Sequence, residues 1–236
     1  MSQPKVNIAR NVEQVRQRIA AACARSGRKP EEVTIVAVSK TFPPEAIEEV
    51  VRAGIPDIGE NRVQEAYAKF QTLGRCATWH LVGHLQTNKV KRALEIFDWI
   101  HSVDSLRLAQ EISRRAAQSG RDEVNVLLEV NTSGEASKYG VKPEEVLSLA
   151  KEVVRLPRLR LQGLMTLAPV VEDPEDARPY FATLRQLRDE LIRAGIVDHL
   201  PHLSMGMTDD FEVAVEEGAT MVRIGRAIFG ERDAAP

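Results

Sequence analysis

VTIVAVSK (residues 33–40) is the stretch that decides the fold, because it joins an almost wholly apolar run to a terminal lysine. The run from Val33 to Val38 is rich in β-branched residues, which is typical of a buried strand. PEAIEEVVRAG (44–54) follows it, with apolar residues at helical spacing and a glycine at its end. A buried strand followed at once by a helix predicts one β/α unit of a parallel sheet.

The same alternation continues along the chain. Seven further strands are predicted, at residues 56–60, 78–83, 99–104, 124–133, 159–169, 202–208 and 220–229, and an extra helix at 6–26 precedes the first strand. Eight strands, at about 28 residues per strand, predict a TIM-type (β/α)8 barrel, a fold of roughly 250 residues. An open doubly wound sheet is the alternative, but the sequence lacks the glycine-rich dinucleotide loop expected after its first strand. No linker interrupts the sequence, so residues 1–236 are expected to form one domain.

The composition is typical of a globular protein that binds neither nucleic acid nor membrane. Hydrophobic residues make up 43% and charged residues 28% of the 236 residues, and the formal net charge is −2. This balance lacks the basic character of nucleic-acid binders, and no apolar run approaches the roughly 20 residues of a membrane helix. The N-terminal MSQPKVNIARNVEQV has no apolar signal-peptide core, so a cytoplasmic location is expected.

The cysteines and the closest histidine pair predict no metal site. Cys23 and Cys76 are interpreted as inert thiols of a cytosolic chain. His80 and His84 have a metal-binding spacing only on a helix, whereas TWHLVGH (78–84) has the composition of a strand. Four residues of strand span roughly 13 Å, which is too far for two ligands of one ion.

The candidate site residues lie where the predicted strands end, because active sites of β/α barrels occupy that rim. Lys40 ends the first strand and shares a face with Val36 and Val38. A desolvated lysine has a lowered pKa and becomes a nucleophile toward aldehydes. A lysine that ends a strand and extends into water is the simpler interpretation of Lys40 taken alone.

The loops after the last two strands have the features of a phosphate site. SMGMT (204–208) offers two hydroxyls and a glycine, and RIGRAIFG (223–230) places Gly225 before a helix start. Gly225 lets a phosphate approach the backbone, the free N–H groups of a helix start attract anions, and Arg226 adds a possible charged contact. Each loop alone is also compatible with an ordinary turn or a packing glycine. A lysine and two such loops on one rim together predict a phosphate-bearing ligand beside a reactive amine.

Several segments together resemble one protein family. They include VAVSKTFPPEAI, IGENRVQEA, WHLVGHLQTNK, EVNTSGEASKYG, LSMGMTDDFEVAVEEGATMVRIG and AIFGERD, and they cover nearly the whole chain, from about residue 33 to 232. The chain resembles the pyridoxal phosphate homeostasis proteins, also called proline synthetase co-transcribed homologues. Proteins of this family are similar to the barrel domain of alanine racemase.

The resemblance implies a site for pyridoxal 5′-phosphate (PLP) and no catalytic residue. The implied cofactor-binding residues are Lys40, Asn61, Ser204, Arg223, Gly225 and Arg226. Lys40 is implied as the lysine that holds PLP as a Schiff base, with Asn61 near the ring. Ser204 and the backbone of Gly225 and Arg226 are implied at the phosphate.

Arg223 is implied beside the pyridine nitrogen, where it cannot accept a proton and leaves the ring a poor electron sink. A salt bridge from Arg223 to Glu129 on a neighbouring strand is the alternative. The chain departs from the family pattern at Thr208, which is often serine, and at Arg226, which is often a small hydroxyl residue.

The implied function is PLP homeostasis, meaning that the protein buffers or delivers the cofactor without a robust reaction of its own. Because the sequence ends at Pro236, the second domain of alanine racemase is not expected. A barrel without that domain is expected to be a monomer. The expected partners are PLP and PLP-dependent apo-enzymes. A minimal racemase or lyase with Lys40 as its only base is one alternative, and a Schiff-base aldolase without PLP is another.

Overall fold

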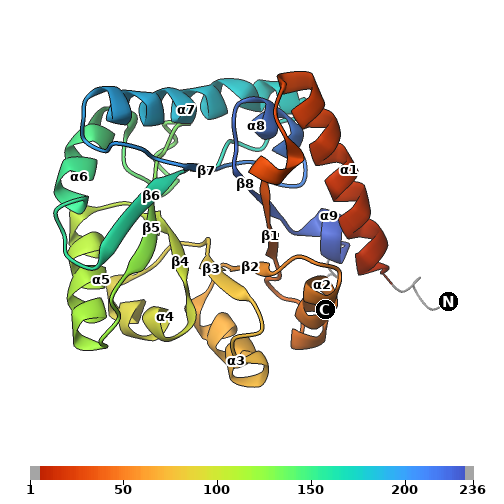
Figure 1. The fold of residues 1–236 in the computed structure, drawn as a ribbon, viewed down its shortest axis with the longest axis horizontal. Coiled ribbons are helices and arrows are strands. Elements are labelled where there is room, and N and C mark those ends of the chain that lie inside the picture. The colour runs from red at the N-terminus through yellow and green to blue at the C-terminus, as the bar shows by residue number, and fades with distance from the viewer. Residues whose placement is uncertain (1–5, 232–236) are drawn as a thin grey trace.

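The computed structural model describes residues 6–231. Eight parallel strands form a closed barrel, which lies at the centre of the molecule (Figure 1). The strands are β1 (Thr34–Val38), β2 (Asp57–Glu60), β3 (Thr78–Leu81), β4 (Trp99–Val103), β5 (Val124–Glu129), β6 (Leu159–Met165), β7 (His202–Ser204) and β8 (Met221–Ile224). They pair in chain order, and β8 closes the ring by pairing with β1, with Met221 opposite Thr34. The predicted (β/α)8 TIM-type barrel is therefore confirmed.

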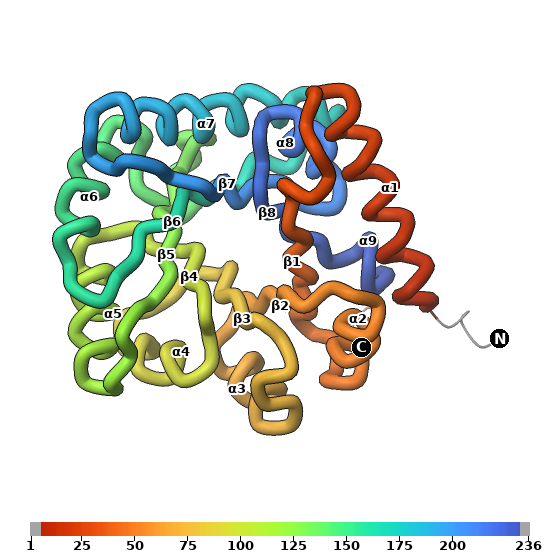
Figure 2. Tube along the Cα trace, in the orientation of Figure 1, coloured from red at the N-terminus to blue at the C-terminus, as the bar shows by residue number. Residues whose placement is uncertain are grey.

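Helices surround the ring of strands. They are α1 (Ile8–Ser26), α2 (Pro44–Arg52), α3 (Val63–Leu73), α4 (Val90–Ile96), α5 (Leu106–Gln118), α6 (Val146–Val153), α7 (Arg178–Arg193), α8 (Phe211–Glu216) and α9 (Arg226–Phe229). The predicted extra helix is α1, which packs against α8 and α9 near the other end of the chain (Figure 2). The Asn7 side chain accepts the Arg10 N–H at the start of α1, and Gly27 ends the helix with φ 68°. No helix within residues 6–231 has the length and apolarity needed to cross a membrane.

The alternation of side chains along the strands produces two apolar clusters. The larger cluster lies between the sheet and the surrounding helices and includes Ala37. The smaller cluster contains Val36, Val38 and Met165 and fills the barrel interior. The prediction that Val36 and Val38 share one face is therefore confirmed. Lys40 follows the last residue of β1 by two positions.

Most strands end earlier than predicted, whereas β2 ends at Glu60 as expected. The strand predicted at 124–133 corresponds to β5, which ends at Glu129. The strand predicted at 220–229 corresponds to β8 and the short helix α9 that follows it. The helix start expected after Gly225 is present. Val130 and Thr132 follow Glu129, and Ile228 and Phe229 follow Ile224, so residues typical of strands do not by themselves mark the end of a strand.

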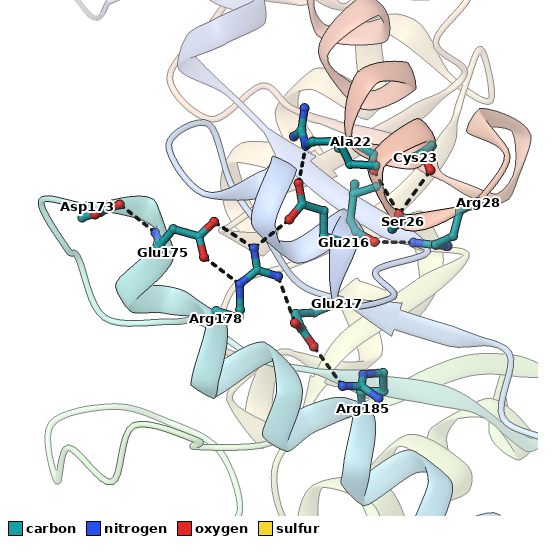
Figure 3. A network of polar contacts seen from close by, with 12 residues as sticks. Ala22, Cys23, Ser26, Arg28, Asp173, Glu175, Arg178, Arg185, Glu216 and Glu217 are labelled. Atoms are coloured by element: carbon teal, nitrogen blue, oxygen red, sulfur yellow. Dashed lines mark hydrogen bonds and ion pairs between the residues drawn. The ribbon is translucent and has the colours of Figure 1, made fainter.

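An ion-pair network joins the helices on the α7 side of the barrel, as Figure 3 shows. The Arg178 guanidinium donates to Glu175, Glu216 and Glu217, at 2.7, 2.7 and 3.0 Å. Arg25 of α1 also donates to Glu216, at 2.6 Å. The network therefore links α7, α8 and α1, and so contributes to the position of the N-terminal helix.

Candidate cofactor site

Lys40 lies in a tight turn at the C-terminal rim of the barrel, two residues beyond the end of β1. Its side chain is half-buried, and the next residue, Thr41, has φ 71°. Lys40, Gly225 and Arg226 line the same cavity, which has a volume of about 370 Å³. The structure thus brings the predicted lysine and one of the two predicted phosphate loops to one cavity, of a size ordinary for a small ligand.

The turn that carries Lys40 is held from behind by α3. Lys69, which is buried, donates to the Ser39 carbonyl at 2.8 Å and lies 2.6 Å from Glu60 Oε1 and 2.9 Å from Glu65 Oε1. Glu65 also accepts the backbone N–H of Thr41 at 2.5 Å. Residues on both sides of Lys40 are therefore fixed to one buried ion pair, which holds Thr41 in a conformation that β-branched residues rarely adopt.

The start of α9 forms one side of the cavity, through Gly225 and Arg226. Gly225 is the N-cap of α9, and a Cβ atom there would come within 3.4 Å of the Val38 carbonyl oxygen. The Thr208 hydroxyl accepts the N–H of Ala227 at 3.3 Å, which places it at the first turn of α9. The guanidinium of Arg226 instead binds Asp209 and lies 3.2 Å from Glu231. An anion here would meet the backbone of Gly225 and Arg226 rather than the Arg226 side chain.

Arg223 is 4% exposed and lies inside the barrel. Its terminal nitrogens donate to the Ser204 hydroxyl at 2.6 Å and to the Thr166 carbonyl at 2.7 Å. These bonds go to neutral oxygens, so they do not form the alternative salt bridge to Glu129. Burial lowers the pKa of Arg223 to about 10, so the guanidinium still carries its proton at neutral pH.

Ser204 and Asn61 are the two remaining predicted site residues. Ser204 is the last residue of β7 and is 0% exposed, and its hydroxyl contacts His101 and accepts a hydrogen bond from Arg223. The phosphate contact expected of Ser204 stays a prediction. Asn61 directly follows β2 and is half-buried, and its backbone lies so close to Gly83 that a Cβ at residue 83 would be 2.2 Å from its carbonyl oxygen.

Glu129 is a further buried group on this rim, at the end of β5. It is 4% exposed, and its Oε2 has no hydrogen-bond partner among residues 6–231. Burial, and then the charge of Asp104, raise the pKa of Glu129 to about 7. Asp104 lies 3.6 Å from His84, whose ring stacks on Tyr139 at 3.8 Å. The rim thus holds a carboxyl group that can change its protonation near neutral pH.

The two histidines of the TWHLVGH segment face different partners. His80 contacts Asp57 and His101, both at 2.9 Å, whereas His84 belongs to the Asp104 cluster. Across residues 6–231, no three His, Cys, Asp or Glu side chains are grouped as a metal would require. Both cysteines are free thiols, Cys23 buried and Cys76 exposed.

Sequence reasoning did not identify four groups around the site, namely Glu60, Glu65, Lys69 and His101. The four-residue spacing of Glu65 and Lys69 was the only local signal, since it is the spacing of an ion pair on one helix face. The contact between His101 and Ser204 joins residues 103 positions apart, so no local pattern predicts it.

The family model described as alanine racemase, N-terminal domain, matches residues 7–233. A pyridoxal phosphate homeostasis protein of Aquifex aeolicus is 48% identical over 228 residues, which are 96% of this chain and 99% of that protein. A protein of the same name from Escherichia coli K12 is 47% identical over 235 residues, covering 96% of this chain and 97% of the relative.

Solved structures agree with the sequence comparison. PipY of Synechococcus elongatus, solved with PLP bound, has a TM-score of 0.83 at 36% identity and covers 95% of this chain and 100% of its own. An alanine racemase of Clostridium difficile has a TM-score of 0.73 at 17% identity, with 97% of this chain matching 56% of that one. The second likeness shows a shared fold.

Proposed function

This chain belongs to the family described as the N-terminal domain of alanine racemase, and we propose that it binds PLP at Lys40 and serves the homeostasis of that cofactor. Its relatives in Aquifex aeolicus and Escherichia coli are named pyridoxal phosphate homeostasis proteins, and its structural relative PipY was solved with PLP bound. PLP, when bound, supplies an aldehyde for a covalent bond to an amine and a phosphate for anchoring. The homeostasis role is to buffer the cofactor or to deliver it to apo-enzymes.

The observation that carries the proposal is the shared cavity of Lys40, Gly225 and Arg226. The Lys40 amine is the nucleophile toward the aldehyde. The backbone N–H groups at the start of α9, with the Thr208 hydroxyl beside them, bind the phosphate. Glycine at residue 225 adds no side chain to this part of the cavity.

Arg223 supports a carrier rather than a strong catalyst. We assign it to the pyridine nitrogen, with Asn61 beside the ring and Ser204 beneath the guanidinium. A guanidinium with a pKa of about 10 donates hydrogen bonds and does not accept a proton, so the ring nitrogen stays unprotonated. A neutral ring withdraws electrons weakly, which disfavours racemisation and transamination.

Glu129 is the observation that favours a second function, a minimal racemase or lyase. Its pKa of about 7 lets it give or take a proton on the same rim as Lys40. Stereospecific turnover of a purified amino acid, lost in both Lys40→Ala and Glu129→Gln, would establish this activity. Turnover that survives Lys40→Ala would be a contaminant.

The test of the proposal is borohydride reduction of the PLP-loaded protein followed by peptide mapping. The expected adduct is on Lys40, and Lys40→Arg should abolish it. Lys138 is the matched control, because it lies in a rim loop and its ammonium is 2.8 Å from Glu135. An adduct on Lys138 that persists in Lys40→Arg would refute the assignment, and a colourless protein that binds no PLP would refute the function.

The proposed setting is a cytoplasmic monomer that exchanges PLP with apo-enzymes. Closure of the barrel leaves no strand edge for pairing with a second copy, which supports the monomer. Mixing the loaded protein with a PLP-dependent apo-enzyme should restore its activity faster than spontaneous release into a PLP-trapping buffer allows. Equal rates would show release without delivery.

A further inference from the structure

A line of polar side chains crosses the interior of the barrel from one mouth to the other. Asp57, the first residue of β2, lies 2.9 Å from His80 Nε2, and His80 Nδ1 lies 2.9 Å from His101 Nε2. His101 Nδ1 then lies 2.9 Å from the Ser204 hydroxyl, which accepts from Arg223 at 2.6 Å. We call these five residues the polar column. His80, His101 and Ser204 are each at most 1% exposed, so the column is shielded from water.

The direction of every hydrogen bond in the column follows from the chemistry of its two ends. The Asp57 carboxylate only accepts and the Arg223 guanidinium only donates. Two neutral imidazoles and one hydroxyl supply three hydrogens for the three contacts between Asp57 and Ser204. His80 must then donate from Nε2 to Asp57, and His101 from Nε2 to His80. The Ser204 hydroxyl therefore donates to His101, and any other arrangement of neutral rings sets two acceptors or two donors against each other.

The surroundings of the imidazoles favour this neutral arrangement. Burial, and then the charges of His80 and Arg223, hold the pKa of His101 well below its ordinary value. The Trp99 ring stacks on His80 at 5.7 Å, and His202 from β7 packs edge-on against Trp99 at 5.2 Å. The pKa of His202 is also lowered, chiefly by burial and then by His80. Protonation of His101 and of His202 inside the barrel is therefore disfavoured.

The column ends in the bonds that orient Arg223. The hydrogen of Ser204 is turned toward His101, so the oxygen presents a lone pair to Arg223. With the Thr166 carbonyl 2.7 Å from the other terminal nitrogen, the guanidinium plane is held at two points. In a reversed column the Ser204 oxygen would accept from both His101 and Arg223, and its hydrogen would lose His101 as an acceptor, which weakens the oxygen as an acceptor for Arg223.

We propose that Asp57 is a positioning residue for the cofactor site, because it sets the direction of the polar column and thereby the orientation of Arg223. The step from Arg223 to PLP rests on the proposed function. Asp57 has a side chain that is 22% exposed, and with Glu13 and Arg16 it lines a cavity of about 530 Å³ beneath α1. A proton or a hydrogen-bond donor that reaches Asp57 from this cavity acts on Arg223 at the opposite rim.

The direction of the column can be measured in the intact protein without PLP. Nitrogen-15 NMR of histidine-labelled protein distinguishes the two imidazole tautomers, and a His101→Gln variant assigns the signals. We expect both His80 and His101 to be protonated at Nε2 and unprotonated at Nδ1 at neutral pH. Protonation of either ring at Nδ1, as a neutral tautomer or an imidazolium, would overturn the proposal.

Three variants test the effect of Asp57 on the cofactor site. Asp57→Ala removes the acceptor, so His101 should populate the Nδ1–H tautomer and the Kd for PLP should rise by about two- to tenfold. Asp57→Asn keeps an acceptor oxygen and should restore wild-type values. Asp98→Ala is the matched control, because Asp98 binds the Trp79 N–H and Arg75 at the same mouth and does not touch the column.

The outcomes separate this proposal from the proposed function. If Asp57→Ala leaves both the His101 tautomer and the Kd unchanged while PLP still binds, Asp57 is not a positioning residue and the function stands. If the wild type and Asp98→Ala bind no PLP, the proposed function fails, and the tautomers in the PLP-free protein still decide the direction of the column. If Asp57→Ala does not fold, the wild-type tautomers decide alone.

Discussion

Replacing Lys69 by methionine tests how the Lys40 turn is held. Methionine keeps much of the apolar length of the side chain and removes the ammonium that binds Ser39, Glu60 and Glu65. The Glu60 carboxyl is 0% exposed, its Oε2 already has no partner, and it would keep only the Ser39 hydroxyl at 2.5 Å. Breaking a buried ion pair by removing one partner costs about 3–5 kcal/mol, so we expect a loss of about 3 kcal/mol of unfolding free energy above neutral pH.

The loss should depend on pH with a defined sign. Burial raises the pKa of Glu60, and Lys69 is the largest influence that lowers it, so the pKa rises further in Lys69→Met. A carboxyl whose folded-state pKa exceeds its unfolded value stabilises the fold below the unfolded pKa, and this stabilisation is lost as pH rises through the folded pKa. The deficit of the variant should therefore be smaller at about pH 5 than at about pH 8.

Urea unfolding followed by circular dichroism at both pH values measures the effect. Lys151→Met, an exposed position on α6, is the control and should change the unfolding free energy by less than about 0.5 kcal/mol. Borohydride trapping at Lys40 should also slow in Lys69→Met, since Ser39 and Thr41 lose their anchors. A deficit below about 1 kcal/mol, or an equal deficit at both pH values, would refute the reasoning.

Three further predictions concern Glu129, Thr208 and Gly83. Because burial raises the pKa of Glu129 from 4.5 to about 7, the wild type without PLP should lose roughly 3 kcal/mol of stability as pH rises through this interval, and Glu129→Gln should not, as urea unfolding across the interval will show. Thr208→Val should weaken PLP binding by about one to two decades through loss of a hydroxyl contact, and an unchanged absorbance titration would place Thr208 outside the site. Gly83→Ala should destabilise the fold by about 3 kcal/mol or more, because its Cβ would lie 2.2 Å from the Asn61 carbonyl oxygen, and a thermal unfolding midpoint equal to that of the wild type would contradict the close approach.

The barrel was predictable because each β/α unit carries its own local signal. Short runs with apolar or β-branched residues indicated all eight strands, and glycines and helical periodicity indicated the intervening helices. Strand ends were overestimated where residues typical of strands continue beyond the sheet, such as Val130 and Thr132 after Glu129. Hydrogen bonding to neighbouring strands ends at those points, and a single sequence contains no information on where a neighbour ends.

The candidate site was predictable only where residues lie near the end of a strand or directly follow it. Lys40, Arg223 and Gly225 were placed by their offsets from β1 and β8, and the structure brings Lys40 and Gly225 to one cavity. The phosphate contact expected of Ser204 was implied by the family resemblance and stays a prediction, whereas its contacts with His101 and Arg223 were not foreseen. Which partner a buried hydroxyl meets is set by contacts across the barrel, and these depend on the register of strands far apart in the chain.

The pairing of β1 with β8 has a consequence for how the protein is made. Thr34 obtains its partner, Met221, only after all the intervening β/α units have been synthesised, and α1 must wait equally long for α8 and α9. Until then, β1 has an unpaired edge and α1 an uncovered apolar face. The barrel can close only after β8 has been synthesised, and the nascent chain before that point is the stage at which this protein most needs protection from aggregation.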